Sequence, residues 1–135
     1  MNALNVRLHG NPPYRSAVVH GGPGAGGEMA PVAAVLGRRR GVAEPIQTAR
    51  SLQGQVEELC HDLRCHTDPP TDLIGFSWGA WLSFLLSAYY PALVRKLILI
   101  GSPPFAERYV DRLRHTRLER LGERDGETYE EIVKA

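Results

Sequence analysis

Residues Gly75-Phe76-Ser77-Trp78-Gly79 form a G-x-S-x-G pattern whose central serine could act as a nucleophile. The apolar residues before the pattern favour a strand, and those after it favour a helix. Gly75 and Gly79 lack the Cβ atoms that would clash in a sharp turn between the two elements. Such a turn holds the Ser77 hydroxyl clear of the backbone, close to helix N–H groups that favour developing negative charge. The pattern therefore predicts a nucleophile elbow and serine-hydrolase chemistry.

The loop His20-Gly21-Gly22-Pro23-Gly24 is the second segment with a chemical signature. It lies between a β-branched run and a helix-like segment, where one N–H of an oxyanion hole is placed in such folds, and the residue after the nucleophile supplies the other. We therefore expect Gly22 and Trp78 to supply the two donors. We expect His20 to brace the loop through hydrogen bonds rather than to act as the base. The residues expected to shape and support the two turns are Gly21, Pro23, Gly24, Gly75 and Gly79.

The same glycine-rich loop permits an alternative hypothesis. Gly22, Gly24 and Gly27 fit the pattern G-x-G-x-x-G, and Glu44 follows near the end of a later strand candidate. This arrangement is typical of a dinucleotide-binding loop. It leaves residues 75–79 unexplained, whereas the hydrolase hypothesis explains both loops and requires no cofactor.

Two further groups of residues could bear chemistry. The spacing of Cys60, His61, Cys65 and His66 departs from the usual pattern of zinc ligands, so we expect no metal site. Asp111 and His115 lie four residues apart and could share a helix face, but a catalytic role for them would require an unusual geometry. We expect a solvated helix face there, and core packing for Trp81 and Phe84.

The composition describes a globular chain. The chain has 135 residues, 43% of them hydrophobic and 23% charged, and its net charge of +1 argues against nucleic-acid binding. The basic run at residues 38–40 is interpreted as a solvated loop. We find no apolar stretch of about 20 residues and no signal-peptide pattern, so no membrane association is expected. Two cysteines give no disulfide framework, and a cytoplasmic location is expected.

The elements that position the two loops follow from periodicity. Strands are expected over residues 3–9, 16–20, 41–46, 72–75 and 95–100, and helices over residues 28–36, 51–64 and 79–90. Their alternation predicts an α/β fold with an open, mainly parallel sheet and helices on both faces. Residues 105–135 are rich in Arg and Glu with a helical pattern, which places a boundary between segments 1–103 and 104–135.

The two loops carry a resemblance to a known family. The motifs HGGPG and GFSWG resemble the prolyl iminopeptidase-like branch of the α/β-hydrolase superfamily. The stretches PVAAVLGRRRGVAEPIQTARSLQGQVEEL and LIGFSWGAWLSFLLSAYYPALVRKLILIGSPPF are similar to small microbial α/β hydrolases. The resemblance implies a Ser-Asp-His triad in that chain order, with Ser77 as nucleophile and Gly22 and Trp78 at the oxyanion hole. It also implies that residues 1–103 are the N-terminal part of the core and that residues 104–135 begin a helical cap.

The sequence departs from this family where the triad acid and base are expected, because the family places both beyond the presumed cap. The chain is therefore expected to be a truncated hydrolase of an ester or amide/peptide-like bond, acting on a small-molecule or short-peptide substrate. A non-catalytic remnant or interaction module is the third hypothesis. An incomplete sheet would expose the apolar strand at 95–100, so self-association through that edge is expected.

Overall fold

The computed structural model describes residues 5–134, which divide between Pro103 and Pro104 into two compact units. The predicted strand at 3–9 is β1 (Val6–His9), and residues 3 and 4 of that prediction lie outside the described part of the chain. The remaining elements of the first unit are β2 (Tyr14–Val19), α1 (Ala30–Gly37), β3 (Gly41–Pro45), α2 (Leu52–His66), β4 (Thr71–Phe76), α3 (Trp78–Tyr89), the short 3₁₀ helix η1 (Pro91–Leu93) and β5 (Val94–Ile100).

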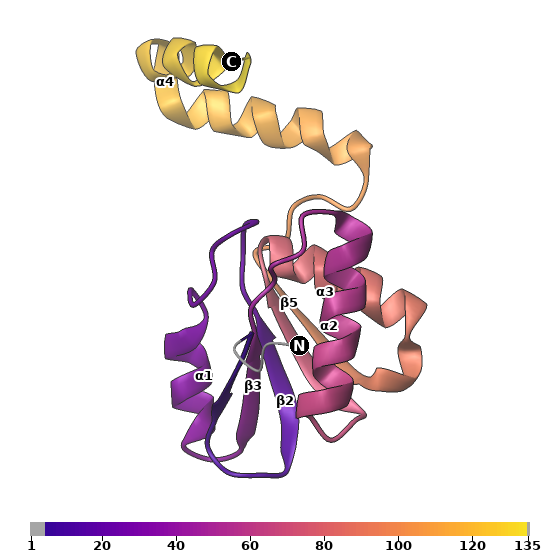
Figure 1. Ribbon diagram of the computed structural model, residues 1–135. Helices are drawn as coiled ribbons and strands as arrows, with labels where there is room; N and C mark the ends of the chain where they lie inside the picture. Colours follow the sequence, from indigo (N-terminus) through magenta and orange to yellow (C-terminus); the bar gives the residue numbers. More distant parts are fainter. Residues whose placement is uncertain (1–4, 135) are drawn as a thin grey trace. The chain divides into compact units, whose positions relative to one another are not determined.

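The five strands form one sheet in the order β1-β3-β2-β4-β5 (Figure 1). The β1–β3 pair is antiparallel, while β3, β2, β4 and β5 are parallel, so the predicted fold class is confirmed. After β2 the chain passes through α1 to β3 on one side, and then through α2 to β4 on the other. The strand order thus reverses between β2 and β4, where Val19 pairs with Gly75. In open α/β sheets ligands bind outside the carboxyl ends of the strands at this position.

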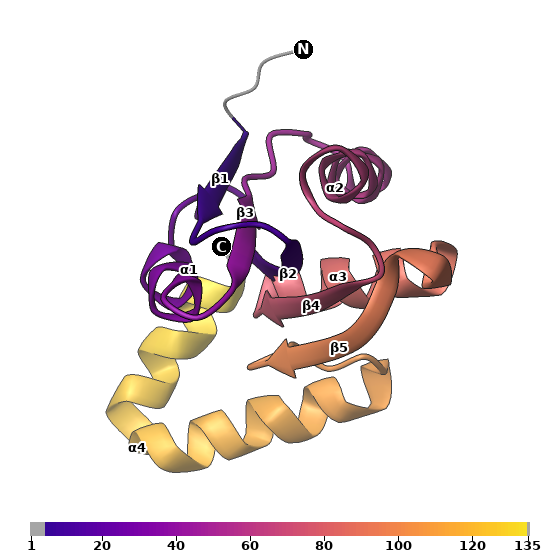
Figure 2. The ribbon, with the colours of Figure 1, turned by 90° about the horizontal axis from the view of Figure 1, so that it is seen from below.

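Helices cover the two faces of the sheet, α1 on one side and α2 and α3 on the other (Figure 2). Successive side chains of a strand point to opposite faces. Ala17, Val19 and Leu73 accordingly pack in the cluster that includes the α2 and α3 leucines. Val18 packs on the other side with Met29, Ala33 and Val42. The strands are therefore buried on both faces near β2, as expected for a parallel sheet.

Most element boundaries differ from the prediction by one or two residues. The helix predicted from residue 28 begins at Ala30, because Pro31 belongs to its first turn and residues 25–28 form a separate hydrogen-bonded turn. Helix α2 begins as predicted after Ser51, whose side chain accepts a hydrogen bond from the Gly54 N–H. Among residues 5–134, none of the helices combines the length and the apolar character that crossing a membrane requires.

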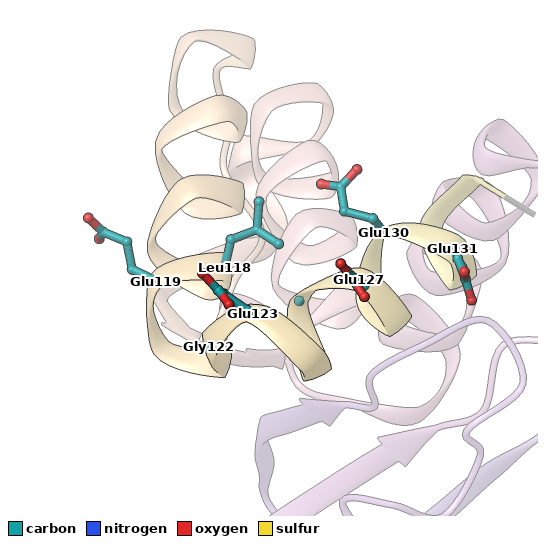
Figure 3. Close-up of a pocket in the computed structure, with 8 residues that line it drawn as sticks. Leu118, Glu119, Gly122, Glu123, Glu127, Glu130 and Glu131 are labelled. Atoms are coloured by element: carbon teal, nitrogen blue, oxygen red, sulfur yellow. The ribbon is translucent and has the colours of Figure 1, made fainter.

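The second unit consists of a 3₁₀ turn, η2 (Glu107–Tyr109), and the kinked helix α4 (Val110–Lys134). The kink is at Gly122, where φ is 75° and ψ is 177°. Arg114 and Glu130 form an ion pair between the two halves of the helix. The halves enclose an open groove of about 940 Å³ whose lining is mainly glutamate (Figure 3). Its lining residues are Leu118, Glu119, Gly122, Glu123, Gly126, Glu127, Glu130 and Glu131.

Candidate active site

Ser77 occupies a sharp turn between the end of β4 and the start of α3. Its φ of 52° makes it the only non-glycine residue with positive φ among residues 5–134. A Cβ at Gly75 would lie 2.3 Å from the Gly79 carbonyl oxygen, and one at Gly79 would lie 2.4 Å from the carbonyl oxygens of Val19 and His20. Only glycine fits these two positions, so the predicted strand–turn–helix is confirmed. The catalytic role of Ser77 stays a prediction.

The backbone of Ser77 is also tied to the edge of the sheet. Its N–H donates to the Ile100 carbonyl, with 2.9 Å between the nitrogen and the oxygen. Ile100 is the last residue of β5 and pairs with Phe76 in the sheet. The position of the turn therefore depends on β5 as well as on β4.

The glycine-rich loop that follows β2 lies directly beside Ser77. A Cβ at Gly21 would lie 3.2 Å from the Ser77 Cβ and 2.7 Å from Glu28 Oε2. The Gly21 N–H donates to Glu28 Oε2 at 3.0 Å, and Gly22 has a φ of 38°. The structure thus brings the two predicted loops together at the carboxyl ends of β2 and β4. Glu28, which holds this loop, was missed because the sequence suggested only a helix start there.

The N–H groups of Gly22 and Trp78 are both available as donors. Trp78 is the first residue of α3, so its N–H has no partner within the helix. The Gly22 N–H donates to no acceptor within residues 5–134. Free donors at the ends of neighbouring strands are what an oxyanion hole requires. Their function stays a prediction.

His20 is fully engaged in the protein interior. It is 1% exposed, its Nδ1 donates to the Gly21 carbonyl at 2.8 Å, and its Nε2 accepts from the Gln47 N–H at 3.2 Å. This arrangement holds the ring in one neutral tautomer with no nitrogen left for Ser77. The bonds agree with a bracing role and leave His20 unable to act as the base in this geometry.

Two other histidines are engaged elsewhere. His9 Nε2 lies 2.9 Å from Glu44 on β3, and the exposed His115 lies 3.2 Å from Glu119 on α4. The Ser77 hydroxyl has no hydrogen-bond partner within residues 5–134. The described residues therefore provide no base in contact with the serine.

The Trp78 side chain forms a hydrogen bond that was not predicted. Its Nε1 donates to Gln55 Oε1 at 2.8 Å, and its ring centroid lies 5.9 Å from that of Trp81. Gln55 is a buried polar residue on the apolar face of α2. A polar residue at such a position requires a hydrogen-bond partner, and this could have indicated the contact from the sequence. The prediction of core packing was wrong for Phe84, which is 44% exposed because it lies on the outer side of α3.

The structure argues against the dinucleotide hypothesis. The Glu44 side chain is fully buried, bonded to His9, and 3.7 Å from Arg7 Nη1. A carboxylate held in this way is not free to bind a ribose hydroxyl. The cysteines and histidines at residues 60–66 do not gather at one point. Cys60 is buried, while Cys65 Sγ lies 3.6 Å from His61 Nε2 at the surface. Within residues 5–134, no three His, Cys, Asp or Glu side chains converge as a metal site.

A mainly parallel sheet with α helices on both faces and a sharp strand–turn–helix at its switch point defines an α/β protein whose candidate site lies at the carboxyl edge of the sheet. Residues 23–126 match the family described as alpha/beta hydrolase fold, and the chain belongs to that family. No sequence among curated proteins is significantly similar to the chain.

Solved structures show the same fold. A thioesterase domain from the curacin biosynthetic pathway is 21% identical with a TM-score of 0.64, and the match covers 86% of this chain and 55% of that one. A serine hydrolase of carbazole degradation, CarC, is 16% identical with a TM-score of 0.65, covering 86% and 51%. An epoxide hydrolase from Vigna radiata is 17% identical with a TM-score of 0.64, covering 88% and 46%. The chain thus spans about half the length of these structures.

Proposed function

We propose that the protein is a serine hydrolase in which Ser77 attacks the carbonyl carbon of an ester or an amide/peptide-like bond. The observation that carries the proposal is the turn at Ser77, with a φ of 52° and the Gly21–Gly22 loop beside it. A strained residue at a ligand-binding position of the fold is a common sign of function. The absence of any engagement of its hydroxyl within residues 5–134 leaves the oxygen free to react.

In this proposal the attack generates a negative charge on the carbonyl oxygen. The N–H groups of Gly22 and Trp78 stabilise that charge, because both are fixed donors at the carboxyl edge of the sheet. A serine hydroxyl is a weak nucleophile unless a neighbouring base accepts its proton. Since the described residues hold no such base, we propose that the triad acid and histidine lie C-terminal to residue 135 in a complete enzyme.

We also propose a class of substrate. The HGGPG and GFSWG motifs support a prolyl iminopeptidase-like branch, and hence a small-molecule or short-peptide substrate. We further propose that residues 104–135 begin the helical cap that would close the pocket, and that the protein is cytoplasmic. Comparing a proline p-nitroanilide with simple p-nitrophenyl esters in the complete enzyme tests the branch.

The nucleophile can be tested directly in this chain by supplying the missing base. Imidazole is added with an activated acyl ester, and acylation of Ser77 is followed by intact mass and peptide mapping. Mass detection separates acyl transfer to the protein from hydrolysis by imidazole itself. We expect an imidazole-dependent acyl adduct on Ser77 that is lost in Ser77→Ala.

The matched control is Ser87→Ala on the same helix, because Ser87 only donates to the backbone carbonyl of Ser83. It should acylate like the unmodified chain. An adduct spread equally over several serines, or one that persists in Ser77→Ala, contradicts the proposal. Complete absence of acylation would favour the second candidate, a non-catalytic interaction module, which the unengaged Ser77 and the edge strand β5 also support.

A further inference from the structure

Five arginines gather around one pocket at the end of the sheet opposite Ser77. The pocket has a volume of about 570 Å³ and lies beside the amino ends of β2, β3 and β5. Because these strands run parallel to β4, their amino ends lie away from the turn that follows β4. No acidic residue lines the pocket. The arginines that line it are Arg15, Arg38, Arg39, Arg40 and Arg95.

One of these arginines already neutralises a carboxylate beside the pocket. Asp72 accepts hydrogen bonds from Arg95 Nε at 2.8 Å and from Arg95 Nη2 at 2.7 Å. These bonds, together with the charges of Arg95, Lys96 and Arg40, hold the pKa of Asp72 below its usual range. Asp72 and the neighbouring Asp68, which accepts from the Tyr14 N–H, are two carboxylates against five arginines, so the pocket keeps an excess of positive charge. This excess is local, because the whole chain carries a net charge of only +1.

The backbone around the pocket is held in place. A Cβ at Gly41 would lie 2.6 Å from the carbonyl oxygens of Asn11 and Pro13. The start of β3 and the loop before β2 are therefore in direct main-chain contact. The Tyr14 N–H donates to Asp68 Oδ2 at 2.8 Å, which fixes the start of β2. The arginines thus project from rigid segments. Less ordering entropy is lost when a ligand binds to such a surface.

A simpler interpretation explains only part of this arrangement. Arg38, Arg39 and Arg40 follow the C-terminus of α1, where cations are favoured by the helix dipole. That effect does not account for Arg15 on β2 or Arg95 on β5. Three separate segments contribute guanidinium groups to one concave surface, and the convergence of charged groups from several segments is what recognition of an anion requires.

We propose that this pocket binds the di- or triphosphate group of a phosphorylated small molecule. Arginine is suited to this ligand, because its planar guanidinium donates two parallel hydrogen bonds to phosphate oxygens. A chain of two or three phosphates can reach guanidinium groups from more than one strand, whereas a single phosphate would contact fewer of them. The site is separate from Ser77 and does not depend on the proposed hydrolase activity.

Calorimetric titration of the full chain with inorganic tripolyphosphate tests the proposal. Arg15→Gln and Arg39→Gln remove exposed arginines from two different elements of the pocket. We expect each variant to weaken binding at least fivefold and the pair to weaken it more than tenfold. Arg50→Gln is the matched control, because it removes the same charge from an exposed arginine outside the pocket. Its affinity should stay within twofold of the unmodified chain.

Two comparisons complete the experiment. Citrate carries a similar charge on carboxylates, and binding as tight as that of tripolyphosphate would overturn the phosphate assignment. ATP tests whether the pocket also binds a nucleoside. An affinity equal to that of tripolyphosphate indicates that only the phosphate chain is bound, and a higher affinity indicates a nucleotide. No heat of binding in low salt, or equal losses in Arg39→Gln and Arg50→Gln, would overturn the site. Circular dichroism of each variant verifies that the fold is retained.

Discussion

At the scale of single residues, the main feature is the backbone conformation of Ser77. A non-glycine residue in this region costs of order 1–3 kcal/mol, which the neighbouring strand and helix must offset. The backbone contacts at Gly75 and Gly79 leave no room for a Cβ at either position. The proposed function and the local strain therefore reside in the same residue. Replacing Ser77 by glycine should raise the stability of the fold and abolish the proposed chemistry.

Ser77→Gly tests this relation. Glycine adopts positive φ without strain, so we expect the free energy of unfolding to rise by about 1 kcal/mol. Urea denaturation followed by circular dichroism measures the change. The matched control is Ser87→Gly in the interior of α3, which should lower stability by about 0.5–1 kcal/mol. A destabilised Ser77→Gly variant would show that the conformation is not strained.

Asp62 on α2 predicts a pH dependence of stability. Burial, followed by repulsion from Glu58, raises the pKa of Asp62 to about 6, from 3.8. The folded state therefore favours the protonated acid. The contribution of Asp62 to the free energy of unfolding is fully present below pH 3.8 and is lost progressively as the pH rises through about 6. One buried Asp62 carboxylate oxygen also has no partner within the described residues.

We expect Asp62→Asn to raise the free energy of unfolding by about 1–2 kcal/mol at pH 8 and to have little effect near pH 4. Urea denaturation of both proteins at several pH values measures the difference. The control is Glu57→Gln, an exposed carboxylate on the same helix. A stability difference that is constant with pH would contradict the raised pKa.

At the scale of elements, the sequence predicted the order and type of the five strands and three α-helices of the first unit, but not the short 3₁₀ helix η1. β-branched and apolar runs predicted the strands, and the capping serine at residue 51 predicted the start of α2. Contacts between distant segments were not predictable. The bond between Trp78 and Gln55, the Glu28 contact with the Gly21 loop and the exposure of Phe84 depend on how helices pack, which periodicity does not encode.

The strand β5 forms one edge of the sheet, as its place in the predicted topology suggested. Its Ile98 and Ile100 side chains are each 44% exposed. They pair with Ile74 and Phe76 and therefore lie on the same face of the sheet as α1. Helix α1 packs on β1, β2 and β3 and leaves these two side chains exposed. A flat apolar edge of this kind promotes pairing with another chain.

We expect the chain to self-associate at micromolar concentration through this edge. Ile98→Lys combined with Ile100→Lys should shift the population toward monomer in sedimentation velocity, because charges on an edge strand oppose pairing. The control is Leu8→Lys, which places a lysine on the opposite edge strand, where Leu8 is 48% exposed. A monomeric unmodified chain would contradict the prediction, and an equal effect of Leu8→Lys would show that the contact is not specific to β5.

At the scale of the whole molecule, Ser77 and the two N–H groups proposed as oxyanion donors have no base hydrogen-bonded to the serine within residues 5–134. Loss of the general base from a serine hydrolase lowers turnover by roughly 10⁶-fold. We therefore expect residues 1–135 to hydrolyse p-nitrophenyl acetate, in the absence of added imidazole, no faster than the Ser77→Ala variant. Steady-state assays at pH 8 measure both rates. A robust rate that vanishes in Ser77→Ala would mean that a base within the chain reaches the serine.

The hydrogen bond from the Ser77 N–H to the Ile100 carbonyl links the proposed nucleophile to the end of an edge strand. Edge strands fray, and the amides that they protect exchange with solvent through local opening rather than global unfolding. Each time β5 lifts from β4, the serine amide is released and the turn loses one of its restraints. Ser77, on which the proposed chemistry depends, is thus held in part by an edge strand that opens easily, and the turn should become more mobile whenever β5 opens.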